Sequence, residues 1–520
     1  MTSTEPLLLA IDFGTQSVRA ILFDPHGHEH ATSAVAIKEP DAPQPGYAEQ
    51  DADYLWDALC SACQGVWQEP SYKSRVAAVA LATMRASMVP VDANGTALRP
   101  VIAWPDQRRT RGVPPVGGLQ GLGLRLAGVA DTVAYFQAEA EANWLATHEP
   151  DNWRRTARYL MLSGYFVRRL TGEFRDSSAA QVGYVPFDFR QRRWARSSSW
   201  KWRALPWLNP DLLPELVHPG QTIGPVNAIA AAATGIPQDT PLIAAAGDKA
   251  CEVLGTGAIE GDVACLSYGT AATVNVVSTR YVEPIPLVPP YPAALPDAWN
   301  LEIQISRGFW LVSWFKSEFG QPETERAAQI GVAPEVLMDD LLHKSVPGAM
   351  GLLAQPYWSP GLRSPGPEAR GAIVGFSAVH TRADIYRALL EGVMYALREG
   401  KERIERRASC RIDRLHVAGG GSRGDSVMQL TADIFGLPAA RPHTSETSAL
   451  GAAIIAAVGA GIYPDFRQAV AAMTRTGDVF DPQPNTSELY QALYSETYLP
   501  LYSRLKPIYR RMRTLTGFRP

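Results

Sequence analysis

The sequence predicts an α/β protein built from two similar lobes, and two kinds of observation support this. Short apolar strands such as residues 75–84 alternate with amphipathic helical patterns such as residues 52–68. An apolar strand, a Gly-Thr turn and a second apolar strand cover residues 7–23, and the same pattern returns at residues 262–276. This second observation indicates either a hairpin duplicated half a chain apart or a chance recurrence of the common Gly-Thr dipeptide.

Composition excludes several classes of protein. A chain of 520 residues that is 46% hydrophobic can bury a large core in more than one domain. Its 49 basic and 52 acidic residues give a net charge of −3, so no basic excess favours nucleic acid as a partner. The longest apolar stretch, residues 448–463, is rich in alanine and glycine and is expected to form a tightly packed internal helix. We expect no membrane partner and, because no secretion signal is evident, a cytoplasmic location.

The first hairpin carries an acid at its turn, in the stretch "LLLAIDFGTQSVRAILFD". In one interpretation these residues are purely structural: Gly14 permits a tight turn, and Asp12 or Thr15 caps it. The same residues can instead present backbone N–H groups to a phosphate, with Asp12 beside them to hold a cation. The local pattern is compatible with both interpretations.

A second acid, Asp248, follows the apolar run "PLIAAAG". A carboxylate that emerges from a buried strand is desolvated, which raises its pKa and suits a general base. The competing interpretation is an N-cap for the helix that follows. Lys249 is adjacent; it can lower the pKa of Asp248, orient a phosphate, or point away.

A run of three glycines in "AGGGSRGD" (residues 418–425) separates a strand from a helix. Such a turn lets a ligand approach the backbone near helix N–H groups. Asp425 is the expected helix cap, and Gly420 and Gly421 are the expected ligand contacts. Neither a P-loop pattern nor a dinucleotide-binding pattern in a βαβ setting is present.

Several segments, in their order along the chain, resemble the FGGY family of carbohydrate kinases of the actin/hexokinase/Hsp70 superfamily. The first hairpin resembles the family's first phosphate motif, and "LSYGTAATV" resembles the second. The segments "IAWPDQRRT", "LTGEF" before Asp176, and "AAGDKACEVLGTG" resemble its Trp-x-Asp-x-Arg, acidic and catalytic segments. "GAIVGFSAVHTRADIYRALLEG" resembles its signature, and the triple-glycine segment with "ETSALGAAIIAAVGAG" resembles its adenosine-binding region. The shared order favours duplication of the hairpin.

The resemblance implies two ribonuclease H-like (actin-like ATPase) lobes with an interlobe catalytic cleft. The expected domains are an N-terminal lobe at 1–257, a C-terminal lobe at 258–505 and a tail at 506–520. The implied activity is ATP- and Mg²⁺-dependent phosphorylation of a hydroxyl of a small sugar or polyol, with a xylulose-like ketopentose favoured. The alternative is a catalytically silent nucleotide- or sugar-binding regulator on the same scaffold. The partners are the sugar and ATP, and a homodimer is possible.

The resemblance also assigns roles to residues. Asp248 is the expected general base, and Asp12 is expected to hold Mg²⁺ through water. The expected ATP and phosphate contacts are Gly14, Thr15, Gln16, Ser17, Arg19, Gly269, Thr270, Gly420, Gly421 and Ser422. The expected substrate contacts are Arg85, Trp104, Asp106, Asp248 and Lys249.

Residues 85 and 86 do not identify which sugar is the substrate. Glycerol kinases have an arginine followed by glutamate here and xylulose kinases usually have Met-His, whereas this chain has Arg85-Ala86. A changed contact to a sugar hydroxyl alters which sugar is accepted. We therefore expect a different substrate or stereochemistry from either group.

Overall fold

The computed structural model describes residues 5–361 and 365–517, which form two compact units. The first unit comprises the described residues of Met1–Gly257, Thr279–Asn300 and Glu446–Thr474. The second comprises those of Ala258–Ser278, Leu301–Ser445 and Arg475–Pro520. Neither unit is continuous along the chain, so the domain limits expected from the sequence stay predictions.

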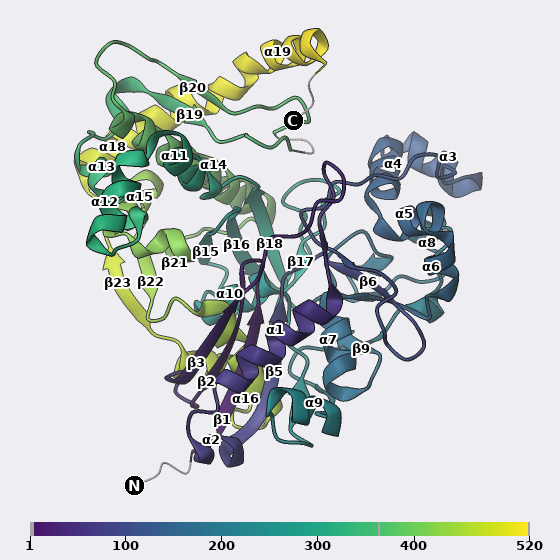
Figure 1. Cartoon of the computed structure of the whole chain (residues 1–520). Helices are drawn as coiled ribbons and strands as arrows, with labels where there is room; N and C mark the ends of the chain where they lie inside the picture. The colour runs from purple at the N-terminus through teal and green to yellow at the C-terminus, as the bar shows by residue number, and fades with distance from the viewer. Residues whose placement is uncertain (1–4, 362–364, 518–520) are drawn as a thin grey trace. The chain divides into compact units, whose positions relative to one another are not determined.

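The first unit is built on a mixed sheet of six strands, four of which are labelled in Figure 1. β1 is antiparallel to β2 and parallel to β5, β2 is antiparallel to β3, β5 is parallel to β14, and β14 is antiparallel to β13. The order across the sheet is β13 (Thr222–Pro225), β14 (Pro241–Ile243), β5 (Val76–Thr83), β1 (Leu7–Phe13), β2 (Ser17–Phe23) and β3 (Glu29–Ala36).

The sheet of the second unit repeats this order of pairing. β15 is antiparallel to β16 and parallel to β21, β21 is parallel to β22, and β22 is antiparallel to β23. The order is β18 (Trp299–Ile305), β16 (Ala272–Ser278), β15 (Val263–Tyr268), β21 (Arg414–Ala418), β22 (Ala439–Pro442) and β23 (Thr476–Phe480). The hairpins β1–β2 and β15–β16 hold the same place in their sheets, which confirms the predicted duplication.

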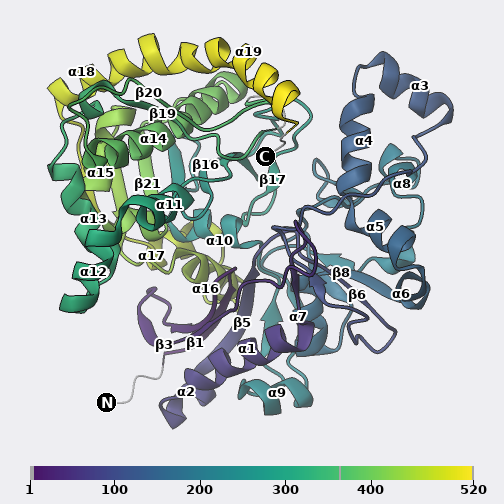
Figure 2. The same ribbon diagram turned by 45° about the horizontal axis from the view of Figure 1, so that its top comes forward.

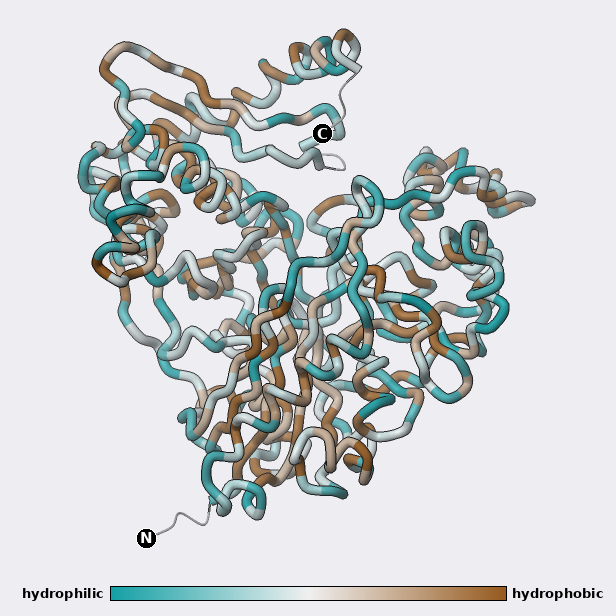
Figure 3. Tube along the Cα trace, viewed as in Figure 1, coloured by the Kyte–Doolittle hydropathy of each residue, from teal (hydrophilic) through white to brown (hydrophobic). Residues whose placement is uncertain are grey.

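Alternation along β1 sends its side chains to two faces of the first sheet. Leu7, Leu9, Ile11 and Phe13 join the large core that includes residues of α1 (Ala52–Gly65). The alternate positions, which end with Asp12, face the other side, where α16 (Thr447–Gly459) packs on β1 and β5. Figure 3 shows the apolar residues that lie along these strands, in brown.

Helix α16 is the alanine- and glycine-rich segment that the sequence predicted to be internal, and most of its residues are buried. It crosses α10 (Asp248–Gly255) so closely that the backbones of the two helices are in contact. A Cβ atom on Gly451 would lie 1.9 Å from the Cys251 carbonyl oxygen, and one on Gly255 would lie 1.9 Å from the Thr447 carbonyl oxygen. Glycine is therefore required on both helices for this crossing.

The remaining elements of the first unit surround the sheet or form a smaller subdomain with a separate core around Trp144 and Tyr159. The subdomain sheet has the order β4 (Glu49–Gln50), β7 (Val101–Ile102), β6 (Met88–Val91) and β8 (Arg158–Met161). Its helices are α3 (Gly118–Leu126), α4 (Ala130–Glu139), α5 (Glu141–His148), α6 (Pro150–Arg155) and α8 (Trp200–Ala204). The other helices are α2 (Pro70–Arg75), α7 (Leu162–Thr171), α9 (Ala228–Thr234) and α17 (Phe466–Met473). Short strands complete the unit: β9 (Arg175–Ser177) with β12 (Glu215–Val217), β10 (Phe187–Asp188) with β11 (Arg193–Trp194), and β17 (Tyr291–Pro292).

The second unit contains the longest helix, α14 (Arg382–Ala408), which starts at a capping box formed by Thr381 and Asp384. Figure 2 shows α14, α15 and α18 from a second side. The other elements are α11 (Trp310–Phe319), α12 (Gln321–Ile330), α13 (Pro334–His343), β19 (Leu353–Gln355), β20 (Ala372–Val374), α15 (Asp425–Phe435), α18 (Pro484–Ala492) and α19 (Leu499–Thr516). Among the described residues, no helix is both long and apolar enough to cross a membrane.

The glycine contact gives a first prediction. Gly451→Ala should lower the free energy of unfolding by about 3 kcal/mol, because the added methyl overlaps a backbone carbonyl that has no room to move. Gly123→Ala is the matched control: its Cβ meets nothing within 4 Å, so the exchange in α3 should be neutral or slightly stabilising. Urea denaturation measures both, and equal midpoints for the two variants would contradict this packing.

Candidate functional site

The turn of the first hairpin is closed by the Gly14 amide, which donates to the Ser17 carbonyl at 3.0 Å. Asp12 and Arg19 are direct partners across the two strands, so their side chains leave the same face of the sheet. The hydroxyl of Thr15 accepts a hydrogen bond from the indole Nε1 of Trp104 at 2.9 Å. The carbonyl of Gln16 is held by the amide of Ile37 at 2.8 Å. The turn is thus a fixed structure beside the Asp12 carboxylate.

Four carboxylates of the first unit influence one another at this face: Asp12, Asp248, Glu252 and Glu446. Three of them have a cationic partner. Glu446 pairs with Arg19 at 3.4 Å, Asp248 with Arg85 at 3.6 Å, and Glu252 with Lys249 at 2.8 Å. Within the described part of the chain, Asp12 accepts neither a hydrogen bond nor an ion pair.

Asp12 therefore carries the uncompensated charge of the group. Burial raises its pKa, and the carboxylates of Asp248, Glu446 and Glu252 raise it further, against the lowering effect of Arg19. The resulting pKa is about 7. A cation bound at Asp12 would relieve this repulsion.

Asp248 is the first residue of α10, and Gly247 takes the N-cap position, so the interpretation of Asp248 as an N-cap is wrong. Its Oδ1 accepts the backbone N–H of Lys249 at 2.7 Å. Burial raises the pKa of Asp248, as the sequence predicted, and the charges of Arg85 and Lys249 limit the rise. The arrangement leaves a desolvated carboxylate at the start of a helix.

The Nζ of Lys249 contacts Glu252 at 2.8 Å, one turn along its own helix; a role of Lys249 in orienting a phosphate stays a prediction. Burial lowers the pKa of Lys249, but the carboxylates of Glu252 and Asp248 outweigh this effect and the net pKa is raised. This answers the question that the sequence left open about its direction. Lys249 stays charged and balances Glu252.

Arg85 lies between Asp248 and an aromatic ring. Its guanidinium lies 5.0 Å from the ring centre of Tyr291, which is a favourable cation–π distance. A Cβ on Gly247 would approach the Arg85 Cγ to 2.9 Å, so glycine makes room for this side chain. Ala86 follows with a φ of 55°, an unusual conformation for alanine.

The two predicted sugar contacts near residue 104 have different surroundings. Trp104 is 39% exposed and contacts Thr15. Asp106 is buried, and its oxygens accept hydrogen bonds from the Ala48 amide at 2.6 Å and from the Arg108 guanidinium at 2.7 and 2.8 Å. Asp106 thereby holds its own loop, and its direct contact with a sugar stays a prediction.

In the second unit, the loop 269–271 joins β15 and β16. The carbonyls of Gly269 and Thr270 accept the amides of Phe309 and Trp310 at 3.1 and 3.2 Å. A Cβ on Gly269 would lie 3.4 Å from a carbonyl oxygen two residues on, and one on Gly14 would lie 3.4 Å from an oxygen three residues on. Both turns have three residues between their strands, 14–16 and 269–271.

The triple-glycine turn forms a short 3₁₀ segment, Gly420–Arg423, after β21. A Cβ on Gly420 would meet nothing within 4 Å, whereas one on Gly421 would meet the Phe309 ring at 2.5 Å. Ser422 is buried and donates to the Gly419 carbonyl. The predicted cap at Asp425 is wrong: Gly424 is the N-cap of α15, and Asp425 pairs with Arg441 at 2.7 Å.

Comparison with known proteins identifies the family. Residues 7–255 match the N-terminal domain and residues 264–460 the C-terminal domain of the FGGY family of carbohydrate kinases. The chain belongs to this family. It is therefore an ATP-dependent phosphotransferase that acts on sugars, as the sequence predicted.

The relatives of this kinase are named for different substrates. It is 28% identical over 491 residues to an uncharacterised sugar kinase from Escherichia coli K12, covering 94% of this chain and 91% of the relative. It is 27% identical over 493 residues to a xylulose kinase from Lactococcus lactis, covering 94% and 95%. The crystal structure of a gluconate kinase from Lactobacillus acidophilus superposes with a TM-score of 0.81 at 20% identity, covering 98% and 100%. The α/β fold with two actin-like ATPase lobes is confirmed.

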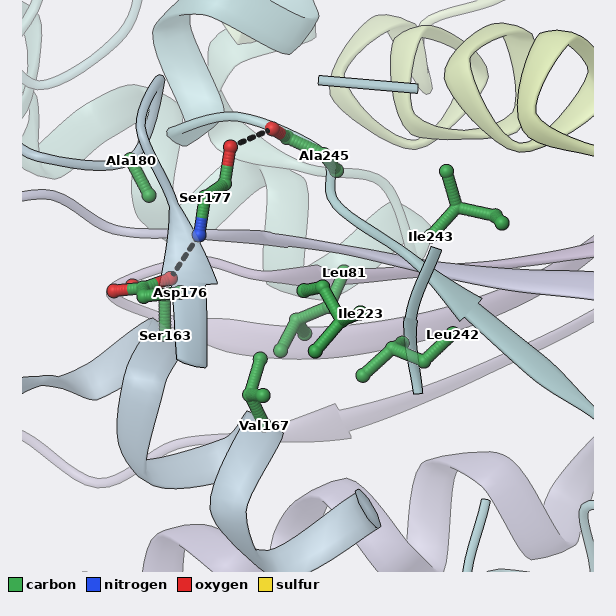
Figure 4. Close-up of a pocket in the computed structure, with 10 residues that line it drawn as sticks. All are labelled: Leu81, Ser163, Val167, Asp176, Ser177, Ala180, Ile223, Leu242, Ile243 and Ala245. Atoms are coloured by element: carbon green, nitrogen blue, oxygen red, sulfur yellow. Dashed lines mark hydrogen bonds between the residues drawn. The ribbon is translucent and has the colours of Figure 1, made fainter. Parts of the chain in front are cut away.

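The kinase also uses a buried acid to fix the segment before its candidate base. Asp176 accepts hydrogen bonds at 2.7 Å from Ser163, Gln181 and the Ser177 amide. Figure 4 shows the bond from the Ser177 amide to Asp176 and the bond from the Ser177 hydroxyl to the Ala245 carbonyl. The adjoining cavity of about 10 Å³ has room for one water. Burial raises the pKa of Asp176 to about 6. Asp176 thus positions Ser177, whose hydroxyl holds the Ala245 carbonyl three residues before Asp248.

Sequence reasoning missed three residues of this site: Glu252, Glu446 and Tyr291. Glu252 lies one helical turn after Asp248, and this spacing was the only local signal for it. Glu446 and Tyr291 reach the site from segments far along the chain, for which a single sequence gives no signal.

Asp12→Asn should stabilise the nucleotide-free kinase while removing its activity. A carboxyl whose pKa is raised favours the folded state when protonated, and that stability is lost as pH rises through about 7. The variant should gain roughly 1–3 kcal/mol at pH 8 and less at pH 5. Asp239→Asn, at an exposed position, should show no such pH-dependent gain. Thermal unfolding at both pH values is the measurement, and a destabilised Asp12→Asn protein at pH 8 would speak against the repulsion.

Proposed function

We propose that this kinase transfers the terminal phosphoryl group of ATP to a hydroxyl of a small sugar or polyol, with a xylulose-like ketopentose favoured. The xylulose kinases among its relatives support the ketopentose. The single observation that carries the mechanism is the position of Asp248, a half-buried carboxylate at the start of α10 whose pKa is raised by desolvation.

Asp248 is proposed as the general base. Its Oδ1 accepts the Lys249 amide and lies near Arg85, whereas within the described residues its Oδ2 accepts no hydrogen bond. Oδ2 is thus available to take the proton from the sugar hydroxyl as that oxygen attacks the γ-phosphorus. Burial raises the pKa of this carboxylate, and the charge of Arg85 opposes the rise.

Arg85, Trp104, Asp106 and Lys249 are proposed to shape the sugar site in different ways. Arg85, fixed between Asp248 and Tyr291, would orient the attacking hydroxyl. Trp104 would offer an apolar face for the sugar. Asp106 acts through Arg108, and Lys249 through Glu252, so both are positioning residues in this proposal.

The nucleotide contacts are proposed from the two glycine turns and the triple-glycine segment. In the first unit these are the backbone from Gly14 to Ser17, through Thr15 and Gln16, and the guanidinium of Arg19. In the second unit they are Gly269, Thr270, Gly420, Gly421 and Ser422. Phosphoryl transfer requires mainly positioning and charge neutralisation, which these groups can supply.

The residues present fit a hydrated Mg²⁺. Asp12 has no protein partner among the described residues and carries a raised pKa, which is the condition that a cation relieves. No cluster of three acids, histidines or cysteines suited to a metal is found in the described residues, so a single carboxylate with water is the proposed ligand set. When bound, Mg²⁺ would supply charge neutralisation at the phosphates.

The demand for Mg²⁺ should increase as the pH falls. Only the ionised Asp12 can hold the cation, so protons compete with it below pH 7 and half-saturating Mg²⁺ should rise about tenfold per pH unit. Glu446→Gln removes a charge that raises this pKa, which should move the effect to lower pH. Initial rates against Mg²⁺ at pH 6 to 8, corrected for protonation of ATP, measure this. A pH-independent requirement would exclude Asp12 as the ligand.

Replacement of the base tests the mechanism directly. Asp248→Asn keeps the shape of the side chain but removes the proton acceptor, so kcat should fall by about 10²–10⁴. Asp239→Asn is the control and should retain full activity. The assay is ADP release with D-xylulose, other ketopentoses, xylitol, glycerol and D-gluconate. The proposal fails if none of them stimulates turnover or if Asp248→Asn turns over normally.

The silent-regulator alternative is not favoured by an observation on this chain, since both Asp12, which is buried, and Asp248, which is half-buried, are present. A cytoplasmic location and a homodimer stay predictions.

A further inference from the structure

A cavity of about 400 Å³ lies in the first unit. Its walls come from residues 178–179, the loop 218–221, the loop 292–297, the side chain of Arg192, and the packed end of α16 with the start of α17. A volume of this size is typical of small-molecule sites. None of Asp12, Arg85, Trp104 or Asp248 lines it.

The cationic group of the cavity is Arg192. Its guanidinium pairs with Asp297 and lies 4.6 Å from the ring centre of Trp299, so two contacts fix its orientation. Its Nη1 is buried and has no hydrogen-bond partner among the described residues. A buried guanidinium N–H without an acceptor is costly. Nη1 is covered by protein atoms, so a phosphate or carboxylate oxygen in the cavity would satisfy it only by drawing the guanidinium away from Asp297, which also lines the cavity.

Polar and apolar groups complete the lining. The ring of His218 contacts the Ser178 hydroxyl through Nδ1 at 3.3 Å, and Gln221 lies in the same loop. Val458 and Phe466 provide an apolar wall. Hydrogen-bond donors beside an apolar surface suit a small organic molecule with one anionic oxygen group, rather than an inorganic ion.

Two walls of the cavity are bonded to the segment that ends at Asp248. The Ala179 carbonyl accepts the Gly247 amide at 3.3 Å. The Gly220 amide donates to the Ala244 carbonyl at 2.9 Å, and the Ala244 amide donates to the Gln221 carbonyl at 2.8 Å. A ligand that orders these walls would therefore act on the position of the candidate base.

We propose that this cavity is a second ligand site, which binds a sugar-sized molecule bearing a phosphate or carboxylate and influences the rate through residues 244–247. The binding part does not depend on the proposed sugar specificity. The link to rate rests on the proposed role of Asp248.

Calorimetric titration tests the site with D-ribose 5-phosphate, D-ribonate and neutral D-ribose, on kinase saturated with a nonhydrolysable ATP analogue. We expect one or both anions to bind and D-ribose not to bind. Arg192→Gln should weaken binding at least tenfold, and Val458→Phe should do so by filling the space without a change of charge. The controls Arg193→Gln, the exposed next residue, and Val479→Phe, on an exposed strand, should bind normally.

The outcomes separate the parts of the proposal. Phosphate but not ribonate binding identifies a sugar phosphate as the ligand class, and the reverse identifies a sugar acid. No heat from either anion up to on the order of 10 mM, or undiminished binding by both Arg192→Gln and Val458→Phe, overturns the site. If an anion binds but does not change kcat in a way that Val458→Phe abolishes, the site is confirmed and its link to Asp248 is overturned. Because the binding assay needs no turnover, its result is independent of the proposed reaction.

Discussion

The backbone contact between α10 and α16 determines where the charged groups of the first unit lie. α10 begins at Asp248, and α16 begins directly after Glu446. Gly255 and Gly451 let the two helices approach until a Cβ on either would overlap a carbonyl oxygen. Because α16 also packs on β1 and β5, this one crossing brings the start of α10, the start of α16 and the end of β1 to one face of the sheet. A wider helix separation would pull Asp248 and Glu446 away from Asp12.

The charge balance at that face explains how two buried acids, Asp12 and Glu252, and two half-buried ones, Asp248 and Glu446, can lie together. Three are neutralised by Arg19, Arg85 and Lys249, each at ion-pair distance. The fourth, Asp12, is left to be balanced from outside the protein, at a cost in stability that burial and its neighbours impose. Such a cost is expected where a site is organised for a charged ligand rather than for folding.

The two sheets show how one plan is used twice with different results. Both place a hairpin next to a parallel strand and end on an antiparallel strand. Only the first has an acid on its leading strand at the turn; the second has Ser267 and Tyr268 at the end of β15, and Tyr268 stacks on Phe309 at 4.5 Å. The repeated backbone supplies glycine turns in both units, whereas the proposed general base lies in the first.

The sequence by itself determined the α/β class, the duplicated hairpin, the internal helix 448–463 and the family. These follow from apolar periodicity, glycine turns and the order of short motifs, which are local properties of the chain. It also indicated Asp12 and Asp248, because an acid at the end of a buried strand is conspicuous in one dimension. Only the tertiary structure decided that Lys249 turns to Glu252, that Asp106 is occupied by Arg108, and that Glu446 and Tyr291 join the site. The reason is physical: side-chain direction and charge pairing depend on helices and loops that meet through folding, and a single sequence does not record which distant segments come into contact.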